Sequence, residues 1–294
     1  MKNRAMSEKF FYEFKSGKYQ NILQTVKQDD DLIMCLRGDY ITIYYKSMRI
    51  LEISENGEYD VDKNYGIIPP NDDTNWIEYF KNAKFALNSY NKTKQMNKLE
   101  KEVQQTIVKE NNTSSICNET DYFIIDIEYT QPEFDGRFDA LAVYWPKNKR
   151  KNGHNLQLAF IEVKAGNNAI GGTSSIAKHY KSVIDFLNNL TQNNEKEQFI
   201  QDIEKMIAQQ RDLGLWNIPH NKHEITLSRS IKPQLIFILA NYNQKSTALR
   251  NELDKFSSIN SKPPFELKFA TSSFVGYGLY GSGMITIDNI LDKK

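Results

Sequence analysis

The stretch that decides the fold, residues 133–166, reads EFDGRFDALAVYWPKNKRKNGHNLQLAFIEVKAG. It holds two apolar segments separated by a basic turn, and each segment carries an acidic residue among apolar neighbours. Asp139 lies in the first segment and Glu162 in the second, 23 positions later (162 − 139). Side chains alternate along a strand, so Glu162 and Lys164 share one face. The sequence therefore predicts a β-hairpin that presents two carboxylates and an amine.

Charge and cysteine content limit the class of protein. Lys and Arg number 38 and Asp and Glu 37, a net charge of +1, so any surface for a nucleic acid must be local. Cys35 and Cys117 fit no zinc-ligand spacing and no disulfide framework, and we expect both to be buried in a reducing compartment. The charged N-terminus and the lack of any run of about 18 apolar residues predict a soluble, cytoplasmic protein without a membrane partner.

The 294 residues are long enough for two units. We predict a β-rich N-terminal accessory module at residues 1–73 and an α/β domain at residues 74–294. Three strands are predicted in the module, at residues 32–36, 40–45 and 49–53, after a segment with helical spacing at residues 9–27. The triplet Arg37-Gly38-Asp39 is predicted to form a turn rather than an adhesion motif, because the chain shows no secretion signal.

The α/β domain is predicted to hold a mixed central sheet flanked by helices. The apolar run at residues 235–240 predicts a strand buried on both faces, which belongs in a sheet covered by helices. Further strands are predicted at residues 122–129, 265–270, 274–280 and 284–288. Helices are predicted from Thr74, as N-cap, to residue 87 and at residues 94–110, 173–190, 195–213 and 248–256.

The acidic residues on the hairpin need a partner, because an unpaired buried carboxylate is costly. Lys164 could supply the opposite charge, and the group would then be a structural ion pair. Alternatively, Asp139 and Glu162 bind Mg²⁺ or Mn²⁺ through oxygen, and Lys164 positions or deprotonates an attacking water. Both interpretations stay open on the residues alone.

The segment GRFDALAV, a turn and the segment LAFIEVKAG together resemble the core of the PD-(D/E)xK superfamily, the restriction-endonuclease-like phosphodiesterases. The resemblance covers about residues 95–245 and leaves the N-terminal module unexplained. It implies a restriction-endonuclease-like fold in which Asp139 and Glu162 bind the metal and Lys164 is catalytic. Phe138 stands where the family motif has proline, and Asp135 is an alternative to Asp139.

Residues near the hairpin extend the site that the resemblance implies. The preceding helix supplies Glu102 as a third metal ligand, with Glu100 as a weaker alternative. His179, on the following helix, is either a phosphate-contacting residue of the site or a surface histidine. Asp126 and Glu128 share one face of the preceding strand, and Glu128 either approaches the metal or faces water. Three glycines, Gly166, Gly171 and Gly172, fit no phosphate-loop pattern and favour a tight strand-to-helix connection.

Basic residues near the hairpin are the predicted contacts for a nucleic-acid backbone. They lie at the hairpin tip (Lys147, Lys149, Arg150, Lys151) and on the following helix (Lys178, Lys181). We therefore expect a Mg²⁺- or Mn²⁺-dependent nuclease whose substrate is a nucleic acid, with DNA favoured over RNA as the expected partner. We also expect a protein partner or a homo-oligomer, and a role in restriction or anti-phage defence. The alternative is a catalytically idle nucleic-acid-binding or assembly module with the same fold.

Overall fold

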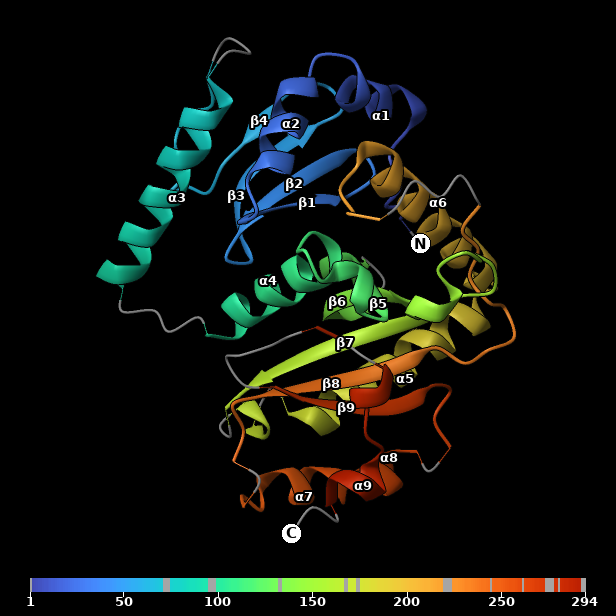
Figure 1. The fold of residues 1–294 in the computed structure, drawn as a ribbon. Helices are drawn as coiled ribbons and strands as arrows, with labels where there is room; N and C mark the ends of the chain where they lie inside the picture. Colours follow the sequence, from blue (N-terminus) through green and yellow to red (C-terminus); the bar gives the residue numbers. More distant parts are fainter. Residues whose placement is uncertain are drawn as a thin grey trace.

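The chain is an α/β protein with an N-terminal four-stranded antiparallel sheet and a five-stranded mixed sheet packed against helices (Figure 1). The computed structural model describes residues 2–70, 75–94, 99–131, 134–166, 169–172, 175–218, 224–243, 245–260, 262–272, 278–279 and 281–291. The predicted combination of a β-rich N-terminal part and a mixed sheet with packed helices is confirmed at this level.

The N-terminal sheet has the order β1-β2-β3-β4. Its strands are β1 (Leu32–Leu36), β2 (Tyr40–Tyr45), β3 (Met48–Ser54) and β4 (Tyr59–Asp60), which confirms the three predicted strands to within one residue. The segment predicted to be helical at residues 9–27 forms two helices, α1 (Glu8–Lys15) and α2 (Gln20–Gln28). Ser16 and Gly17 separate them, because both are poor helix formers.

Helix α3 (Trp76–Thr93) packs against the N-terminal sheet. The Tyr79 hydroxyl donates to the Ile50 carbonyl at 3.2 Å, and Trp76 and Phe80 lie in the same apolar core as the strands. Asn75 is the N-cap, and the predicted cap Thr74 lies outside the described residues. The helix predicted at the start of the α/β domain therefore packs with the elements that precede it.

The five-stranded sheet has the order β5-β6-β7-β8-β9. Its strands are β5 (Tyr122–Gln131), β6 (Phe134–Tyr144), β7 (Gln157–Ala165), β8 (Gln234–Ala240) and β9 (Glu266–Ser272). β5, β6 and β7 form an antiparallel meander, whereas β7, β8 and β9 are parallel. Every residue of β8 is buried, so the prediction of a strand covered on both faces is confirmed.

Helices cover both faces of this sheet. On one face α4 (Leu99–Asn112) places Val103 and Ile107 in an apolar cluster with residues of β7 and β8. The other face, with Phe160 and Phe237, packs against α5 (Ile176–Gln192), α6 (Lys196–Leu213), α7 (Ala248–Leu253) and α8 (Phe256–Ile259). The helix predicted at residues 248–256 is thus two short helices. Short 3₁₀ turns are η1 (Cys117–Glu119), η2 (Lys147–Lys149) and η5 (Gly281–Gly283).

The C-terminal strand predicted at residues 284–288 is wrong. One isolated bridge joins Phe269 and Ile285, and the chain then enters α9 (Ile287–Leu291). The reason is local, since the Thr286 carbonyl accepts from the Ile290 amide at 3.1 Å and begins a helical turn. The strand predicted at residues 274–280 lies mostly outside the described residues.

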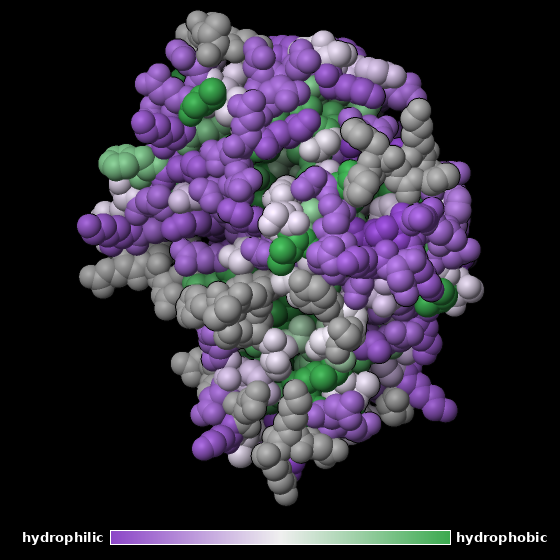
Figure 2. Space-filling view, viewed as in Figure 1, coloured by the Kyte–Doolittle hydropathy of each residue, from purple (hydrophilic) through white to green (hydrophobic). Residues whose placement is uncertain are grey.

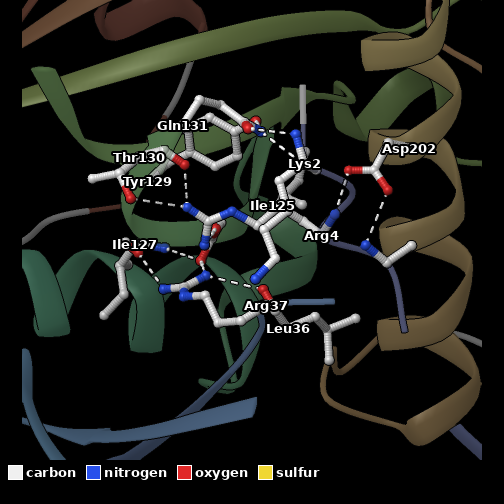
Figure 3. A network of polar contacts seen from close by, with 12 residues as sticks. Lys2, Arg4, Leu36, Arg37, Ile125, Ile127, Tyr129, Thr130, Gln131 and Asp202 are labelled. Carbon is white, nitrogen blue, oxygen red and sulfur yellow. Dashed lines mark hydrogen bonds and ion pairs between the residues drawn. The ribbon is translucent and has the colours of Figure 1, made fainter. Parts of the chain in front are cut away.

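The outer edge of β5 is satisfied by side chains instead of another strand. Asn112 of α4 accepts from the Ile124 amide and donates to the Ile124 carbonyl, both at 2.8 Å. Arg37, in the β1–β2 turn, donates to the Ile127 carbonyl at 2.7 Å and forms a buried ion pair with Asp126 (Figure 3). These side chains hydrogen-bond to backbone groups of β5 that a neighbouring strand would otherwise pair with, so they protect the edge of the sheet from pairing with another strand.

The N-terminal segment is fixed between β5 and α6. The amides of Arg4 and Ala5 donate to the two carboxylate oxygens of Asp202 at 2.7 and 3.0 Å (Figure 3). The Arg4 guanidinium donates to the Thr130 carbonyl on β5. The N-terminal sheet, α6 and the five-stranded sheet are therefore joined through buried polar contacts. The triplet Arg37-Gly38-Asp39 is a turn, as predicted, and its arginine is buried.

Hydrophilic residues cover most of the face seen in Figure 2, and apolar side chains form small separate groups on it. This distribution accords with the mean hydropathy of −0.62. Within the described segments, no helix combines the length and the apolar character needed to cross a membrane. Cys35 and Cys117 are both buried, as predicted.

Candidate functional site

Asp139 and Glu162 lie where β6 and β7 separate. The ladder between these strands runs from Tyr144–Gln157 to Ala140–Ile161. Beyond it, the Asp139 side chain takes the place of a backbone partner, and its Oδ2 accepts from the Val163 amide at 2.8 Å. The Asp139 carboxylate is thereby held beside Glu162, the residue that precedes Val163.

Gln104 of α4 holds the other oxygen of Asp139. Its Nε2 donates to Oδ1 of Asp139 at 2.6 Å, and both side chains are buried. Sequence reasoning missed this residue because its neutral amide carries no catalytic signature. The signal was present in the helix pattern, since Gln104 follows the buried Val103 and lies one turn after Glu100.

Glu162 is the most unusual residue of the site. Its side chain is fully buried, and within the described part of the chain neither carboxylate oxygen accepts a hydrogen bond of complete geometry. The side chain and backbone of Asp139 nevertheless lie close enough to lower the pKa of Glu162. His179 of α5 places its Nδ1 3.0 Å from Oε2, although the orientation of the ring does not make this contact a hydrogen bond. The structure thus places His179 beside Glu162. Of the two interpretations left open, a residue of the site and a surface histidine, this position agrees with the first.

Burial, with a smaller effect of neighbouring carboxylates, favours protonation of Asp139 and Glu162. The pKa of Asp139 lies well above its usual value because of burial first and the charges of Glu162 and Glu100 second. Burial raises the pKa of Glu162 to about 8, and the nearby charge of Lys164 acts in the opposite sense. Burial and Lys164 lower the pKa of His179 to about 4, so the imidazole is neutral at pH 7. A cation bound between the carboxylates would replace the protons that they otherwise retain.

Lys164 is buried near these groups but is not their ion-pair partner. Its side chain is 2% exposed, and neither Asp139 nor Glu162 is among the carboxylates that form ion pairs within 4.0 Å of a described lysine or arginine. Its charge nevertheless affects the pKa values of Glu162 and His179. The geometry therefore does not favour a structural ion pair as the explanation of the Glu-x-Lys sequence.

The acidic residue that α4 turns toward the site is Glu100, not Glu102. Glu100 raises the pKa values of both Asp139 and Glu162, whereas Glu102 is half exposed and pairs with Lys46 at 3.2 Å. With about 100° between successive residues, Glu102 lies on a different face from Glu100 and Gln104. The structure thus places Glu100, the weaker alternative, on the side of the two carboxylates and Glu102 away from them. Which of the two binds a metal stays a prediction.

Glu128 lies opposite Asp139 in the β5–β6 ladder, between residues that pair with Ala140 and Phe138. Its carboxylate forms ion pairs with Lys101 at 3.4 Å and Arg137 at 2.5 Å. Glu128 was predicted either to approach the metal or to face water. Its carboxylate instead pairs with two basic side chains. Asp126, on the same strand, belongs to the buried contact with Arg37 and not to the site.

The basic hairpin tip lies at the opposite end of the sheet from Asp139. Pairing from Ala140 to Tyr144 separates the two, which is about 17 Å of strand at about 3.3 Å per residue. Lys147 pairs with Glu119, while Lys149 and Lys151 are exposed. Arg150 donates to the Trp145 carbonyl at 2.7 Å and stacks over Phe123. The sequence placed this tip beside the site, but antiparallel pairing places it away.

The remaining predicted site residues lie in α5, in the connection from β7 to α5, or outside the described residues. Lys178 and Lys181 are exposed, and Lys181 pairs with Asp185 at 2.5 Å. Gly166 and Gly172 have φ values of 78° and 80°, which fits the predicted tight connection from β7 to α5. Gly171 has a negative or extended φ, unlike the other two. The side chain of Asp135 lies outside the described residues.

The donor set suits a hard divalent cation in chemistry but is small. Two buried carboxylates, with Glu100 and His179 nearby, offer oxygen and nitrogen ligands. In the segments that the structure describes, no three His, Cys, Asp or Glu side chains gather closely enough to form a complete metal-binding group. Water and substrate oxygens would have to supply the other ligands, as is usual for Mg²⁺. Comparison with protein-family models, curated proteins and solved structures found no match for this chain.

The raised pKa of Glu162 predicts a pH-dependent contribution to stability. Between the ordinary value of 4.5 and the folded value of about 8, the folded chain holds a proton that the unfolded chain releases. The stability that this proton contributes is complete below the lower value and is lost as pH rises through the upper one. Glu162→Gln is therefore expected to gain stability relative to the wild type as pH rises, in chemical denaturation with EDTA present. Glu102→Gln, which removes a half-exposed carboxylate outside the buried pair, is measured alongside as the control. A pH-independent difference between Glu162→Gln and the wild type would contradict the assignment.

Proposed function

We propose that the protein is a metal-dependent nuclease that hydrolyses phosphodiester bonds of nucleic acids, with DNA as the favoured substrate class. The observation that carries the proposal is the buried Glu162 carboxylate, which accepts no hydrogen bond of complete geometry within the described residues and lies beside a second buried carboxylate. Such a pair is unfavourable unless a proton or a cation neutralises it. A divalent cation would neutralise the two carboxylates, and it would also supply the metal that the proposed hydrolysis needs.

The arrangement of elements also supports the proposal. A helix precedes the hairpin, Asp139 and the Glu-x-Lys sequence lie at one end of that hairpin, and the next helix brings His179 to Glu162. These are the positions that resemblance to the PD-(D/E)xK superfamily implies for the metal ligands, the catalytic lysine and a polar residue near the phosphate. A restriction-endonuclease-like fold and a role in restriction or anti-phage defence form part of the same proposal.

In this proposal Asp139 and Glu162 would hold Mg²⁺ or Mn²⁺, and the ion would supply Lewis-acid chemistry for the hydrolysis of the phosphodiester. Gln104 and the Val163 amide fix Asp139 in place, so its carboxylate is oriented before substrate arrives. Lys164 positions the attacking water or accepts its proton. Hydrolysis adds the water oxygen to phosphorus and breaks one P–O bond, and the resemblance implies a 5′-phosphate on one product.

A second candidate is a nucleic-acid-binding or assembly module that has the same fold without hydrolysis. The observation that favours it is the closure of the site, since Asp139, Glu162 and Lys164 are 5%, 0% and 2% exposed. The small donor set among the described residues points the same way. Binding of nucleic acid without any metal-dependent cleavage would be the mark of this alternative.

Cleavage of a substrate panel distinguishes the two candidates. Labelled single-stranded and double-stranded DNA and RNA are incubated with the protein in Mg²⁺, Mn²⁺ or EDTA, and the fragments are separated by electrophoresis. We expect cleavage in Mg²⁺ or Mn²⁺, none in EDTA, and none with Asp139→Asn. Cleavage in EDTA, or equal cleavage by Asp139→Asn, would refute the proposed site.

A further inference from the structure

Three cations gather beside the candidate site, away from the basic hairpin tip. Lys46 is in the β2–β3 turn, Lys101 is on α4 and Arg137 is on β6. Arg137 precedes Asp139 by two residues, about 7 Å along an extended strand. Lys101 follows Glu100, the α4 residue that acts on the site carboxylates. Three elements that are distant in sequence thus supply one basic group, which we call the Lys46 cluster.

The β2–β3 turn is seated on α4 in a way that directs Lys46 outward. The Ser47 amide donates to Oε1 of Gln105 at 3.2 Å, and Nζ of Lys101 donates to the Ser47 carbonyl at 3.0 Å. Ser47 is buried, whereas the Lys46 side chain is 34% exposed. This anchorage brings a cation of the N-terminal sheet to the end of α4 nearest the site.

Three residues at the cluster have backbone conformations that their side chains disfavour. Lys46 and Ser47 have φ values of 52° and 50°, in a two-residue hairpin loop where Asn-Gly is the favoured pair. Glu128, which binds Lys101 and Arg137, has a φ of 53° within a strand. Conformations of this kind cost free energy and persist where the surrounding structure imposes them. Their coincidence at one place, beside Asp139, points to a functional surface.

The cations are available to a polyanion. Lys101 and Arg137 side chains are 30% and 53% exposed, and the acidic partners of the three cations are Glu102 and Glu128. Three positive charges thus face two negative ones. Ion pairs as exposed as that between Lys46 and Glu102 contribute little, so exchanging that carboxylate for a phosphate costs little.

We propose that the Lys46 cluster binds the phosphate backbone of the nucleic-acid substrate and that the N-terminal sheet takes part in substrate binding through Lys46. This inference rests on the proposed nuclease function and replaces the hairpin tip as the expected backbone contact. Phosphates on either side of the scissile bond fit a group of cations that borders Asp139. The N-terminal sheet then has a direct role in the reaction beyond its packing against the α/β part.

Binding measured without cleavage tests the inference. Fluorescence anisotropy with labelled single- and double-stranded DNA in EDTA, over a range of salt concentrations, compares the wild type with Lys46→Gln/Arg137→Gln and with the tip variant Lys149→Gln/Lys151→Gln. Lys101 is left intact because it also bonds Ser47. The cluster variant is expected to bind more weakly and to lower the slope of log K against log salt by about 1.5 to 2, while the tip variant changes it little. Thermal unfolding checks that both variants fold.

The outcomes separate this inference from the proposed function. An unchanged salt slope in the cluster variant, or no binding by the wild type, overturns the inference. If the wild type still cleaves in Mg²⁺ while the cluster variant binds normally, the inference fails and the nuclease proposal stands. If binding depends on the Lys46 cluster but no metal supports cleavage, the inference stands and the nuclease proposal fails.

Discussion

Lys164→Met is expected to reduce the rate of phosphodiester hydrolysis by about 10²- to 10⁴-fold, the usual effect of losing a group that transfers or positions a proton. Methionine keeps most of the length of the side chain, so the buried strand around it stays packed. The charge that acts on Glu162 and His179 is lost. Single-turnover cleavage of a labelled substrate in Mg²⁺ measures the effect on the chemical step.

The matched control is Lys178→Met on α5. Lys178 is exposed and next to His179, so this variant removes a charge that is the smallest of the five influences on the pKa of His179, and it leaves Lys164 in place. Lys178→Met is expected to change the rate of hydrolysis by less than about tenfold, which is smaller than the decrease expected for Lys164→Met. Equal rates for Lys164→Met and the wild type would show that the amine takes no part in the reaction.

Arg37→Met is expected to destabilise the protein by about 3–5 kcal/mol, because it removes one partner of a buried ion pair. Asp126 would then keep the Ile127 amide, which donates to its Oδ1 at 2.8 Å, and the more distant charge of Arg4, 3.8 Å away. The Ile127 carbonyl on the β5 edge would lose the hydrogen bond from Arg37. The free energy of unfolding is measured by chemical denaturation. Since Arg37 joins the N-terminal sheet to β5, the loss should appear as a single transition at lower denaturant.

Arg49→Met provides the matched control, since Arg49 pairs with Glu52 and Asp60 on a partly exposed surface. Its loss is expected to cost about 1 kcal/mol or less. Adding Asp126→Asn to Arg37→Met should restore part of the stability, because the buried charge is then gone. If Arg37→Met and Arg49→Met cost the same, the buried pair has no special weight in joining the two sheets.

Local sequence patterns predicted most of the elements. The apolar run of β8 and the alternation along β1, β2 and β3 gave these strands nearly to the residue, because each depends on its own side chains. Asp139, Glu162 and Lys164 were predicted as site residues for the same reason, since charged residues within apolar strands are conspicuous. The isolated bridge at Ile285 was mistaken for a strand because the helix that begins two residues later, at Ile287, was not recognised.

Features that depend on tertiary structure were not predicted. The hairpin tip was placed beside the site because it is close in sequence, whereas antiparallel pairing separates the two. Gln104 of α4 contacts Asp139 on β6, and the turn at Lys46 contacts Gln105 of α4. Both contacts join residues that are far apart in sequence, so no local pattern indicates them. Helix geometry could have favoured Glu100 over Glu102 at the outset, because the buried stripe of α4 already defines the face of Glu100.

Titration of the metal-free protein with Mn²⁺ in a calorimeter, near pH 7, tests most directly the claim that Asp139 and Glu162 form a divalent-cation site. The wild type and Glu102→Gln are expected to bind Mn²⁺ with release of protons, because the raised pKa of Glu162 keeps it protonated until the metal binds. Glu162→Gln is expected to lose the binding and the proton release. Binding of equal strength by Glu162→Gln, or no binding by the wild type, would contradict the metal site.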